Sequence, residues 1–428
     1  MSFVVVIVTL VLNSMHFLPA SQYLIAETDR LALLAFKNKI SDPLGALSSW
    51  NESSHCSNWT GITCSRRHPS RVAVLELTSM SLRGPISPYI GNLSFLQDLA
   101  MSLNHFTGEI TQELGRLFRL QVLRLEDNTL TVKIPKNITL CKNLQVIELG
   151  GNKLVGGIPT ELGSLSKLQR LALWRNPLGG TIPVSLSNLS ALHSLILRSN
   201  HLHGYIPSEL GQLSRLKHFQ VADNDLSGTI PTQLFNISSI SAIAVTSNEL
   251  HESIPNNIGI TLPNLETFII GMNKFSGTLP TSISNLSRLS ALDVSSNQFT
   301  GPVPPNLGLS FVNLEKNNLG GAEVDDLSFF DSLANCSHME KLSITYNNLS
   351  GKLPGSIANL SITLTELYMG ENNIFGDIPT GIENLVSLNG LGMESNLLNG
   401  SIPVSIGKLP NLIRRYNSAK PWQLWQTE

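Results

Sequence analysis

Apolar residues recur along this chain in a fixed pattern. Segments such as LQVLRLEDNTLTVKIP, LQVIELGGNKLVGGIP and LHSLILRSNHLHGYIP share the form LxxLxLxxNxLxGxIP. In the first part of this form, alternate leucines point to one side of a short strand, and the residues between them point to the other. A glycine two residues past the next apolar residue permits a tight bend. Each copy is therefore predicted to be a short strand followed by a turn.

The asparagine of this form marks a regular period. It recurs at a constant step from Asn104 through Asn128 to Asn248, and the series continues to Asn396 with one step shortened and the next lengthened. With a first copy in which Met80 replaces the asparagine, the chain has fourteen turns. One turn cannot bury its own leucines, so the turns must stack with their strands parallel, about 4.8 Å apart. The asparagine amides would satisfy backbone groups inside this stack.

These features predict an α/β repeat solenoid, a leucine-rich repeat superhelix with a parallel β-sheet on its concave face. The expected boundaries are a signal peptide at 1–26, an N-terminal cap at 27–70, repeats at 71–412 and a non-repeat tail at 413–428. Charged residues are 14% and hydrophobic residues 42%, which suits a long buried spine. The net charge of -2 leaves no basic field for nucleic acid.

The amino end carries the apolar run FVVVIVTLVL. This run is too short to span a bilayer and resembles the apolar part of a secretory signal peptide, with cleavage expected between Ala20 and Glu27. Disulfides persist in the secretory compartment, so Cys56 and Cys64, which lie before the first repeat, are predicted to form a bridge that closes the cap. Cys141 and Cys336 occupy a leucine phase of their turns and are expected to be free core thiols, eight turns apart.

Sequons for N-glycosylation also favour the secretory route. Five of them lie twelve residues before a ladder asparagine, so their glycans would share one side of the coil and leave the outward strand positions bare. The eleven sequons are at Asn51, Asn58, Asn92, Asn137, Asn188, Asn236, Asn285, Asn335, Asn348, Asn359 and Asn399.

Two segments resemble one known family. ETDRLALLAFKNKISDPLGALSSWNESSHCSNWTGITC, from Glu27 to Cys64, resembles the helical N-terminal cap of plant leucine-rich-repeat receptor-like kinases. NNLGGAEVDDLSFFDSLANCSHMEKLSI, from Asn317 to Ile344, resembles the long insert of the subfamily containing the plant receptors for bacterial flagellin and elongation factor. The resemblance implies an extracellular receptor of innate immunity for peptides or microbial patterns. It also implies a plasma-membrane location for full-length members and leaves room for a co-receptor leucine-rich-repeat kinase.

The repeat pattern stops near the carboxyl end. A fifteenth turn beginning at Leu412 would place Arg415, Asn417 and Lys420 at buried positions. Burying such groups unpaired would cost several kcal/mol each. The family's carboxy-terminal cap, membrane helix and serine/threonine kinase are not found in this sequence. We therefore expect a truncated ectodomain whose tail after Ile413 is mobile or drapes Trp422, Leu424 and Trp425 over the last turn.

The sequence contains none of the common catalytic motifs GxGxxG, GxxxxGK[ST], HRD, DFG, GxSxG and HExxH. His201 and His203 form an HxH pair near His193 and His218, but loop histidines are far more common than metal sites. No enzyme activity, cofactor, metal or membrane span is expected. Three hypotheses remain: a receptor ectodomain for a peptide or protein ligand, a secreted inhibitor of a wall-degrading enzyme, and a non-functional truncated product.

The sequence also predicts where a ligand would bind. Most outward strand positions carry small groups, such as Ala100, Ser102, Ala242 and Ser295, but turns three to seven carry large and charged ones. Tryptophan and arginine dominate binding energy in interfaces, so Trp174 is the expected anchor, and Arg124, Arg170 and Arg198 are expected to hold a carboxylate. A merely solvated face is an almost equal alternative. The predicted contacts are Arg124, Glu126, Glu148, Arg170, Trp174, Arg175, Ile196, Arg198, His218 and Gln220.

Overall fold

A computed structural model describes residues 26–51, 58–321, 326–334 and 336–413. The chain divides into two units, Met1–Leu168 and Gln169–Glu428, which are built from the same kind of turn. The predicted signal peptide up to residue 25, Cys56, Asn335 and the tail from Arg414 onward lie outside the described residues.

The first unit begins with the cap, whose helix α2 (Glu27–Lys37) buries Ala32, Leu33 and Phe36. Acidic residues in its first turn and Lys37 in its last turn complement the helix dipole. The carboxylate of Asp29 is fully buried, accepts a hydrogen bond from the Val72 backbone N–H at 2.9 Å and pairs with the Arg71 guanidinium at 2.9 Å. This buried pair ties the cap helix to the first repeat.

The loop half of the cap is held by aromatic packing. The rings of Trp50 and Trp59 stack with their centroids 5.5 Å apart, and Trp50 Nε1 donates to the Thr60 carbonyl at 2.9 Å. Cys64 is disulfide-bonded, and its predicted partner Cys56 lies outside the described residues. Its strand β1 (Ile62–Cys64) pairs antiparallel with the first repeat strand, so the cap covers the open end of the stack.

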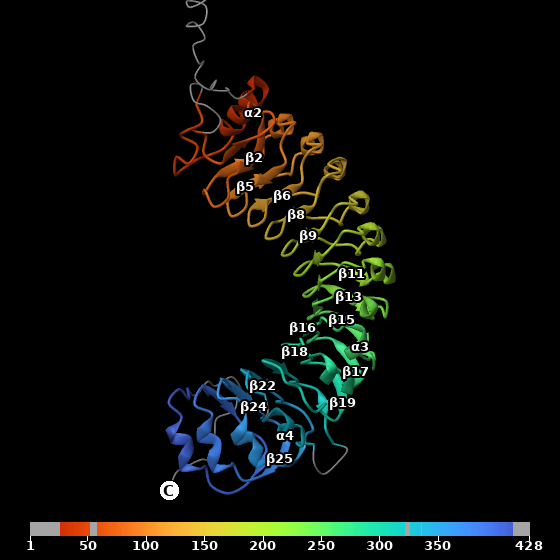
Figure 1. Cartoon of the computed structure of the whole chain (residues 1–428), viewed down its shortest axis with the longest axis vertical. Coiled ribbons are helices and arrows are strands. Elements are labelled where there is room, and N and C mark those ends of the chain that lie inside the picture. The colour runs from red at the N-terminus through yellow and green to blue at the C-terminus, as the bar shows by residue number, and fades with distance from the viewer. Residues whose placement is uncertain (1–25, 52–57, 322–325, 335, 414–428) are drawn as a thin grey trace, which may run out of the picture. The chain divides into compact units, whose positions relative to one another are not determined.

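The repeats of the first unit stack their strands in parallel and in register, with Leu75, Leu99, Leu123 and Ile147 aligned on the buried side. Figure 1 shows this stack below the cap helix. The strands are β2 (Val72–Glu76), β4 (Asp98–Ala100), β6 (Val122–Arg124) and β8 (Val146–Glu148). A second, smaller sheet contains β3 (Arg83–Pro85), β5 (His105–Gly108) and β7 (Thr129–Leu130). The 3-10 helices are η2 (Pro88–Asn92), η3 (Gln112–Arg116), η4 (Lys136–Leu140) and η5 (Thr160–Ser164).

The second unit repeats this arrangement over more turns, again with its main strands parallel. These strands are β9 (Arg170–Ala172), β10 (Ser194–Ile196), β12 (His218–Gln220), β14 (Ala242–Ala244), β16 (Thr267–Ile269), β18 (Ala291–Asp293), β20 (Phe311–Asn313), β22 (Lys341–Ser343), β24 (Glu366–Tyr368) and β26 (Gly390–Gly392). Side strands are β11 (His203–Tyr205), β13 (Asp225–Gly228), β15 (Glu249–Glu252), β17 (Lys274–Thr278), β19 (Gln298–Gly301), β21 (Asn318–Leu319), β23 (Ser350–Lys352), β25 (Asn373–Gly376) and β27 (Leu397–Leu398).

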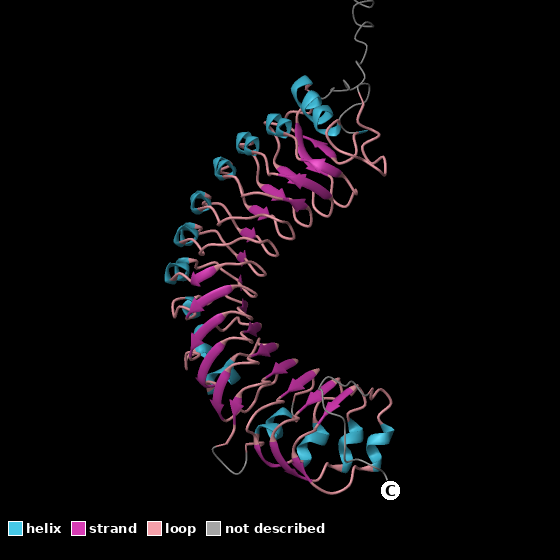
Figure 2. Cartoon of the chain, turned by 180° about the vertical axis from the view of Figure 1, so that it is seen from behind, coloured by secondary structure: helices cyan, strands magenta, loops and turns pink. Residues whose placement is uncertain are grey.

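Short helices complete the turns of the second unit. They are η6 (Val184–Asn188), η7 (Ser208–Gln212), η8 (Leu234–Asn236), α3 (Ile258–Thr261), η9 (Thr281–Asn285), α4 (Phe329–Leu333), η10 (Gly355–Asn359), η11 (Thr380–Asn384) and η12 (Val404–Lys408). Figure 2 shows that within each unit these helices run along the side of the turns remote from the main strands. The predicted solenoid with a parallel sheet is confirmed. The side strands and the 3-10 geometry of the helices were not predicted.

The ladder asparagines do what the sequence predicted. Asn128 is buried; its Nδ2 donates to the carbonyls of Met101, Leu125 and Glu126 at 3.0 to 3.2 Å, and its Oδ1 accepts from the Phe106 backbone N–H at 2.9 Å. Two of these partners, Met101 and Phe106, belong to the preceding turn. Each such side chain therefore satisfies backbone groups that water cannot reach and joins two turns.

The residue just before each ladder asparagine adopts the left-handed conformation. Leu103, Asp127, Arg175 and Tyr346 have φ values between 49° and 55° although none is glycine. This conformation costs roughly 1–2 kcal/mol for an L-residue, so the hydrogen bonds of the stack must impose it. The predicted glycine bend also occurs, for example at Gly204 with φ +80°.

Candidate ligand-binding face

The outward side chains of the main strands form what we call the strand face, considered separately in each unit. Parallel register aligns these side chains in columns across the turns; Ala100, Arg124 and Glu148 form one column, and Ile196, Gln220 and Ala244 form another. Successive turns in such a column are about 4.8 Å apart. Side chains that are one repeat apart in the sequence can therefore contact the same ligand.

Charged groups gather on the strand face of the first unit. Arg124 Nε lies 3.2 Å from the nearer Glu148 carboxylate oxygen, and its Nη1 lies 3.6 Å from an oxygen of Asp98. Arg124 remains about one-third exposed, while the Glu148 side chain is mostly covered. Arg124 is thus already engaged by two carboxylates, so an incoming anion would have to compete with them. The structure therefore weakens the expectation that Arg124 holds a ligand carboxylate.

Two carboxyl groups on this face are poorly solvated. Burial raises the pKa of Asp98, which Arg124 opposes and Glu76 reinforces. Burial likewise raises the pKa of Glu126, against the effects of its own backbone, Ser102 and Arg124. Oxygens Oδ1 of Asp98 and Oε2 of Glu126 are buried without a hydrogen-bond partner. The charged forms of both groups are therefore incompletely stabilised.

The second unit carries the predicted aromatic anchor. Trp174 follows strand β9 and is half-buried. The guanidinium carbon of Arg198 lies 5.0 Å from the centre of the Trp174 ring, and that of Arg175 lies 5.1 Å from it. Both arginines are exposed. A rigid indole next to two cations is a combination that binds anionic and aromatic groups.

The neighbouring polar residues belong to the same stack. Arg170, Ser194 and His218 align in register on β9, β10 and β12. His218 Nδ1 lies 2.8 Å from Ser194 Oγ. Burial lowers the pKa of His218, and the nearby Arg170 and Lys217 lower it further. The imidazole is therefore held toward its neutral form, and the positive charge of this region comes from the arginines.

The predicted contacts differ from one another in exposure and in position. Ile196 lies in register between Ala172 and Gln220 and is only 8% exposed, so it offers little surface to a ligand. Arg175 lies beyond the strand in the left-handed position, although its side chain still reaches the Trp174 ring. Gln220 is half-buried on β12. The outward groups Ala100 and Ser102, expected to be exposed small residues, are only 1% and 3% exposed.

Asp98 and Ser194 also belong to the strand face, although neither was among the predicted contacts. The period itself would have identified them, because Asp98 occupies the outward position of its turn that Arg170, Ser194 and His218 occupy in theirs. The period does not predict how far an outward side chain is buried, because its burial depends on the size of the side chains one turn away.

The sequons leave this face free. Asn92, Asn188, Asn236 and Asn285 end the short helices η2, η6, η8 and η9, on the side of the turns remote from the main strands. Every sequon asparagine within the described residues is exposed. Glycans at these positions would not cover the strand face.

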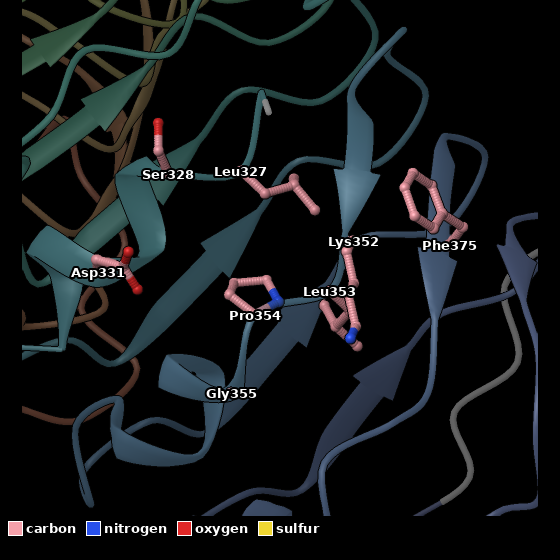
Figure 3. A pocket seen from close by; sticks show the side chains of 8 residues that line it. All are labelled: Leu327, Ser328, Asp331, Lys352, Leu353, Pro354, Gly355 and Phe375. Atoms are coloured by element: carbon pink, nitrogen blue, oxygen red, sulfur yellow. The ribbon is translucent and has the colours of Figure 1, made fainter. Parts of the chain in front are cut away.

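Other candidate sites are weaker. Within the described ranges, no three His, Cys, Asp or Glu side chains are grouped so that they could hold a metal ion. A pocket of about 420 Å³ lies between α4 and the side strands β23 and β25 (Figure 3). It is lined by Leu327, Ser328, Asp331, Lys352, Leu353, Pro354, Gly355 and Phe375. No described helix is long and apolar enough to cross a membrane.

Comparison with known families places the chain among repeat proteins. The family described as "Leucine-rich repeat region" matches residues 76–301, which is more than half of the chain. The "Leucine rich repeat N-terminal domain" matches 26–65, and "Leucine Rich Repeat" matches 338–360 and 363–385.

Relatives and solved structures point to plant receptors. LRR receptor-like serine/threonine-protein kinase EFR of Arabidopsis thaliana is 51% identical over 78 residues, a stretch that spans 18% of this chain and 8% of EFR. The plant peptide hormone receptor RGFR1 in complex with RGF2 has a TM-score of 0.67 and 32% identity, covering 77% of this chain and 56% of that one. The PEPR1-AtPEP1 structure has a TM-score of 0.70 and 29% identity, covering 91% and 65%.

Proposed function

Since this chain belongs to the leucine-rich-repeat family, we propose that it is the ligand-recognition ectodomain of a plant receptor-like kinase and binds a peptide or microbial protein. The role in innate immunity rests on the insert at 317–344, which resembles that of the flagellin and elongation-factor receptors. The name of EFR includes a serine/threonine-protein kinase activity, which is a property of EFR. For this chain we propose ligand recognition alone.

The observation that carries this proposal is the placement of Trp174 beside the guanidinium groups of Arg175 and Arg198. Trp174 is half-buried and is not one of the buried core residues, and its indole is rigid, so little conformational entropy is lost when a ligand packs on it. The two guanidinium groups supply donors for a carboxylate or for backbone carbonyls beside it. Several aligned side chains can thus contact successive residues of an extended peptide.

Two further features support an extracellular setting. Cys64 is disulfide-bonded, and disulfides persist in oxidising compartments. The sequon asparagines of the described residues are exposed and lie off the main strands, where glycans would not hinder a ligand. We propose the apoplast as the place of binding. A co-receptor leucine-rich-repeat kinase stays a prediction.

The proposal is tested with the full chain secreted from plant cells and presented with a displayed library of random peptides. Peptides that it retains are measured against Trp174→Ala and Arg198→Ala. The control is Ser295→Arg, since Ser295 has the outward position of Trp174 five turns later. We expect the two alanine variants to weaken binding by about 30-fold, the effect of losing about 2 kcal/mol, and the control to bind normally.

The opposite pattern would reject the proposed site. If binding is lost only in Ser295→Arg, the ligand lies on later turns of the second unit. If the wild-type chain retains no peptide, recognition of peptides is rejected.

A further inference from the structure

The first unit has a basic edge, formed by the loops that precede its main strands and by the last loop of the unit. These loops contain no Asp or Glu, and they occupy residues 65–71, 94–97, 118–121, 142–145 and 166–168. Their cations are Arg66, Arg67, Arg71, Arg119, Lys142 and Lys167. The strand face of the same unit, by contrast, carries several carboxylates. An anion that approaches this unit is therefore attracted to the basic edge and repelled by the strand face.

Contacts between successive turns make the basic edge continuous. The guanidinium carbons of Arg71 and Arg119 lie 4.3 and 4.0 Å from the centre of the Phe95 ring, which belongs to the turn between them. Asn143 Nδ2 donates to a carbonyl of the preceding turn at 2.9 Å. Lys167 Nζ donates to Asn143 Oδ1 at 2.7 Å. Side chains from five successive turns thus lie along one line.

Much of the charge on the basic edge is not neutralised by the chain itself. Arg71 is paired with the buried Asp29. Arg119 is exposed, contacts the Phe95 ring and makes no ion pair with any described residue. Lys142 and Lys167 are also exposed, and their side-chain hydrogen bonds within the described part of the chain go to neutral oxygens. These three cations therefore remain available to an anionic ligand.

The groups beside these cations suit the hydroxyls and rings of sugars. Gln97, Gln121 and Gln145 follow one another in register, because the backbone N–H of each donates to a carbonyl one turn earlier at 2.7 or 2.8 Å. None of the three is buried, and their amides offer both donors and acceptors. The ring of Phe118, next to Arg119 in the chain, is 63% exposed. It gives a flat apolar surface on which a sugar ring can stack.

From these observations we infer that the basic edge binds a linear polysaccharide of uronic acids. Such a polymer has a carboxylate on every ring and hydroxyls between the carboxylates, which matches a line of cations with amides between them. Arg119 and Lys167 lie two turns apart, about 9.6 Å at the spacing of parallel strands. The inference goes beyond peptide recognition and uses a different surface. It takes only the extracellular setting from the proposed function, and that setting favours a polysaccharide over a nucleic acid.

Two other anionic partners fit this surface less well. An acidic peptide would pair with the cations, but it has no hydroxyl on each residue for the glutamine amides and no sugar ring for Phe118. An anionic membrane is broad, whereas the cations of this unit form a line that is bordered by the carboxylates of the strand face. The combination of spaced cations, amides and an exposed aromatic ring therefore favours the polysaccharide.

The test measures binding of the full secreted chain to polygalacturonate in calcium-free buffer. Fully methyl-esterified polygalacturonate is the matched neutral polymer, and we expect the wild-type chain to bind it at least about 10-fold more weakly. The triple variant combines Arg119→Gln, Lys142→Gln and Lys167→Gln. Since these side chains are exposed and make no ion pair within the described residues, the fold should tolerate their loss. We expect the triple variant to bind polygalacturonate about 10- to 30-fold more weakly than the wild type.

The control variant makes the same change in net charge elsewhere. It removes three exposed cations from the equivalent loops of the second unit, as Arg215→Gln, Lys217→Gln and Arg288→Gln. We expect it to change the affinity for polygalacturonate by less than about 2-fold, because a distant exposed charge is screened by salt. Phe118→Ser removes the exposed ring and no charge. It should weaken polygalacturonate about 3- to 10-fold and leave binding of polyglutamate unchanged.

The outcomes separate this inference from its rivals and from the proposed function. Polyglutamate or phosphatidylserine vesicles that bind as tightly as polygalacturonate would overturn it in favour of an acidic peptide or a membrane. Equal affinity for the charged and esterified polymers, or unchanged affinity in the triple variant, would also overturn it. If the wild-type chain binds polygalacturonate but retains no peptide, the proposed function fails and this inference stands. The reverse result leaves peptide recognition standing and rejects the polysaccharide.

Discussion

The guanidinium of Arg198 lies over the ring of Trp174, which belongs to the preceding turn of the second unit, with 5.0 Å between the guanidinium carbon and the ring centre. Such a contact at an exposed site stabilises the fold by about 0.5–1 kcal/mol. That is a small part of the free energy of unfolding of a domain. We therefore expect the pair to contribute more to ligand binding than to the stability of the fold.

The first prediction separates these two roles. Trp174→Ala removes a half-buried ring and its two cation–π contacts, and we expect the free energy of unfolding to fall by about 1 kcal/mol. Urea unfolding followed by circular dichroism measures this loss. Leu173→Ala, which removes a fully buried neighbour, is the control and should cost about 2–5 kcal/mol. A comparable loss in both variants would mean that Trp174 is a structural residue.

The second prediction concerns the asparagine ladder. Asn317 is buried, its Nδ2 donates to the carbonyls of Val294, Leu314 and Glu315, and its Oδ1 accepts from the Phe299 N–H. Asn317→Ala strands these backbone groups and should cost about 2–4 kcal/mol. The adjacent Asn318 is exposed, so Asn318→Ala should change stability by less than about 0.5 kcal/mol. Denaturant midpoints of the two variants measure the contrast, and equal midpoints would contradict the role of the ladder.

The third prediction concerns pH. Burial holds the folded-state pKa of Glu126 above its ordinary value of 4.5, so the folded state binds the proton more tightly than the unfolded state. Stability from this group is present below pH 4.5 and is lost as the pH rises through the folded-state pKa. Glutamine does not ionise, so the Glu126→Gln variant should not lose this stability as the pH rises. We expect the variant to melt higher than the wild type at neutral pH and at about the same temperature in acid.

Glu161 provides the control of opposite sign. Its hydrogen bond to Lys136 holds its pKa below the ordinary value, so its contribution is present at neutral pH and is lost in acid. Glu161→Gln should therefore melt no higher than the wild type at neutral pH. If Glu126→Gln behaves in the same way, the buried charge at Glu126 is adequately compensated, contrary to the structure.

The fourth prediction concerns thiols. Cys141 and Cys336 are free and buried, and burial raises the pKa of Cys141 to about 11. At pH 8 the thiolate fraction of Cys141 would be about 0.1%, so alkylation of the native chain should be slow at this residue. Both should react on unfolding without reductant. Mass spectrometry of iodoacetamide-treated protein, native and unfolded, identifies the labelled cysteines. Rapid native labelling of Cys141 would contradict its burial.

Much of the fold could be predicted because its signals are periodic. The leucines that form the core and the asparagines that satisfy the backbone are required in every turn, so their chemistry is visible as spacing. The left-handed residue before each asparagine was not predictable, since Leu103, Asp127, Arg175 and Tyr346 share no chemistry. The surrounding hydrogen bonds impose that conformation, and the side chain remains free to vary.

The candidate site was predicted less completely for a related reason. The period identified the outward positions of Trp174 and Arg198, but whether an outward residue is accessible depends on its neighbours one turn away. Ser102 and Ile196 are both outward and both buried. Likewise, the ion pair between Asp29 and Arg71 joins the cap to the first repeat across 42 residues, and no local pattern indicates it.

Across the joint between two turns, the ladder asparagines bind main-chain atoms, as Asn128 does with Met101 and Phe106 of the preceding turn. The asparagine hydrogen bonds that join two turns therefore do not depend on the other side chains of either turn. A duplication or excision of one whole repeat would present the next asparagine with an equivalent carbonyl and N–H, whereas a change of half a repeat would not. A gene encoding such a chain can therefore gain or lose whole turns by unequal recombination without breaking the asparagine ladder. Each such event changes the order of the side chains on the strand face.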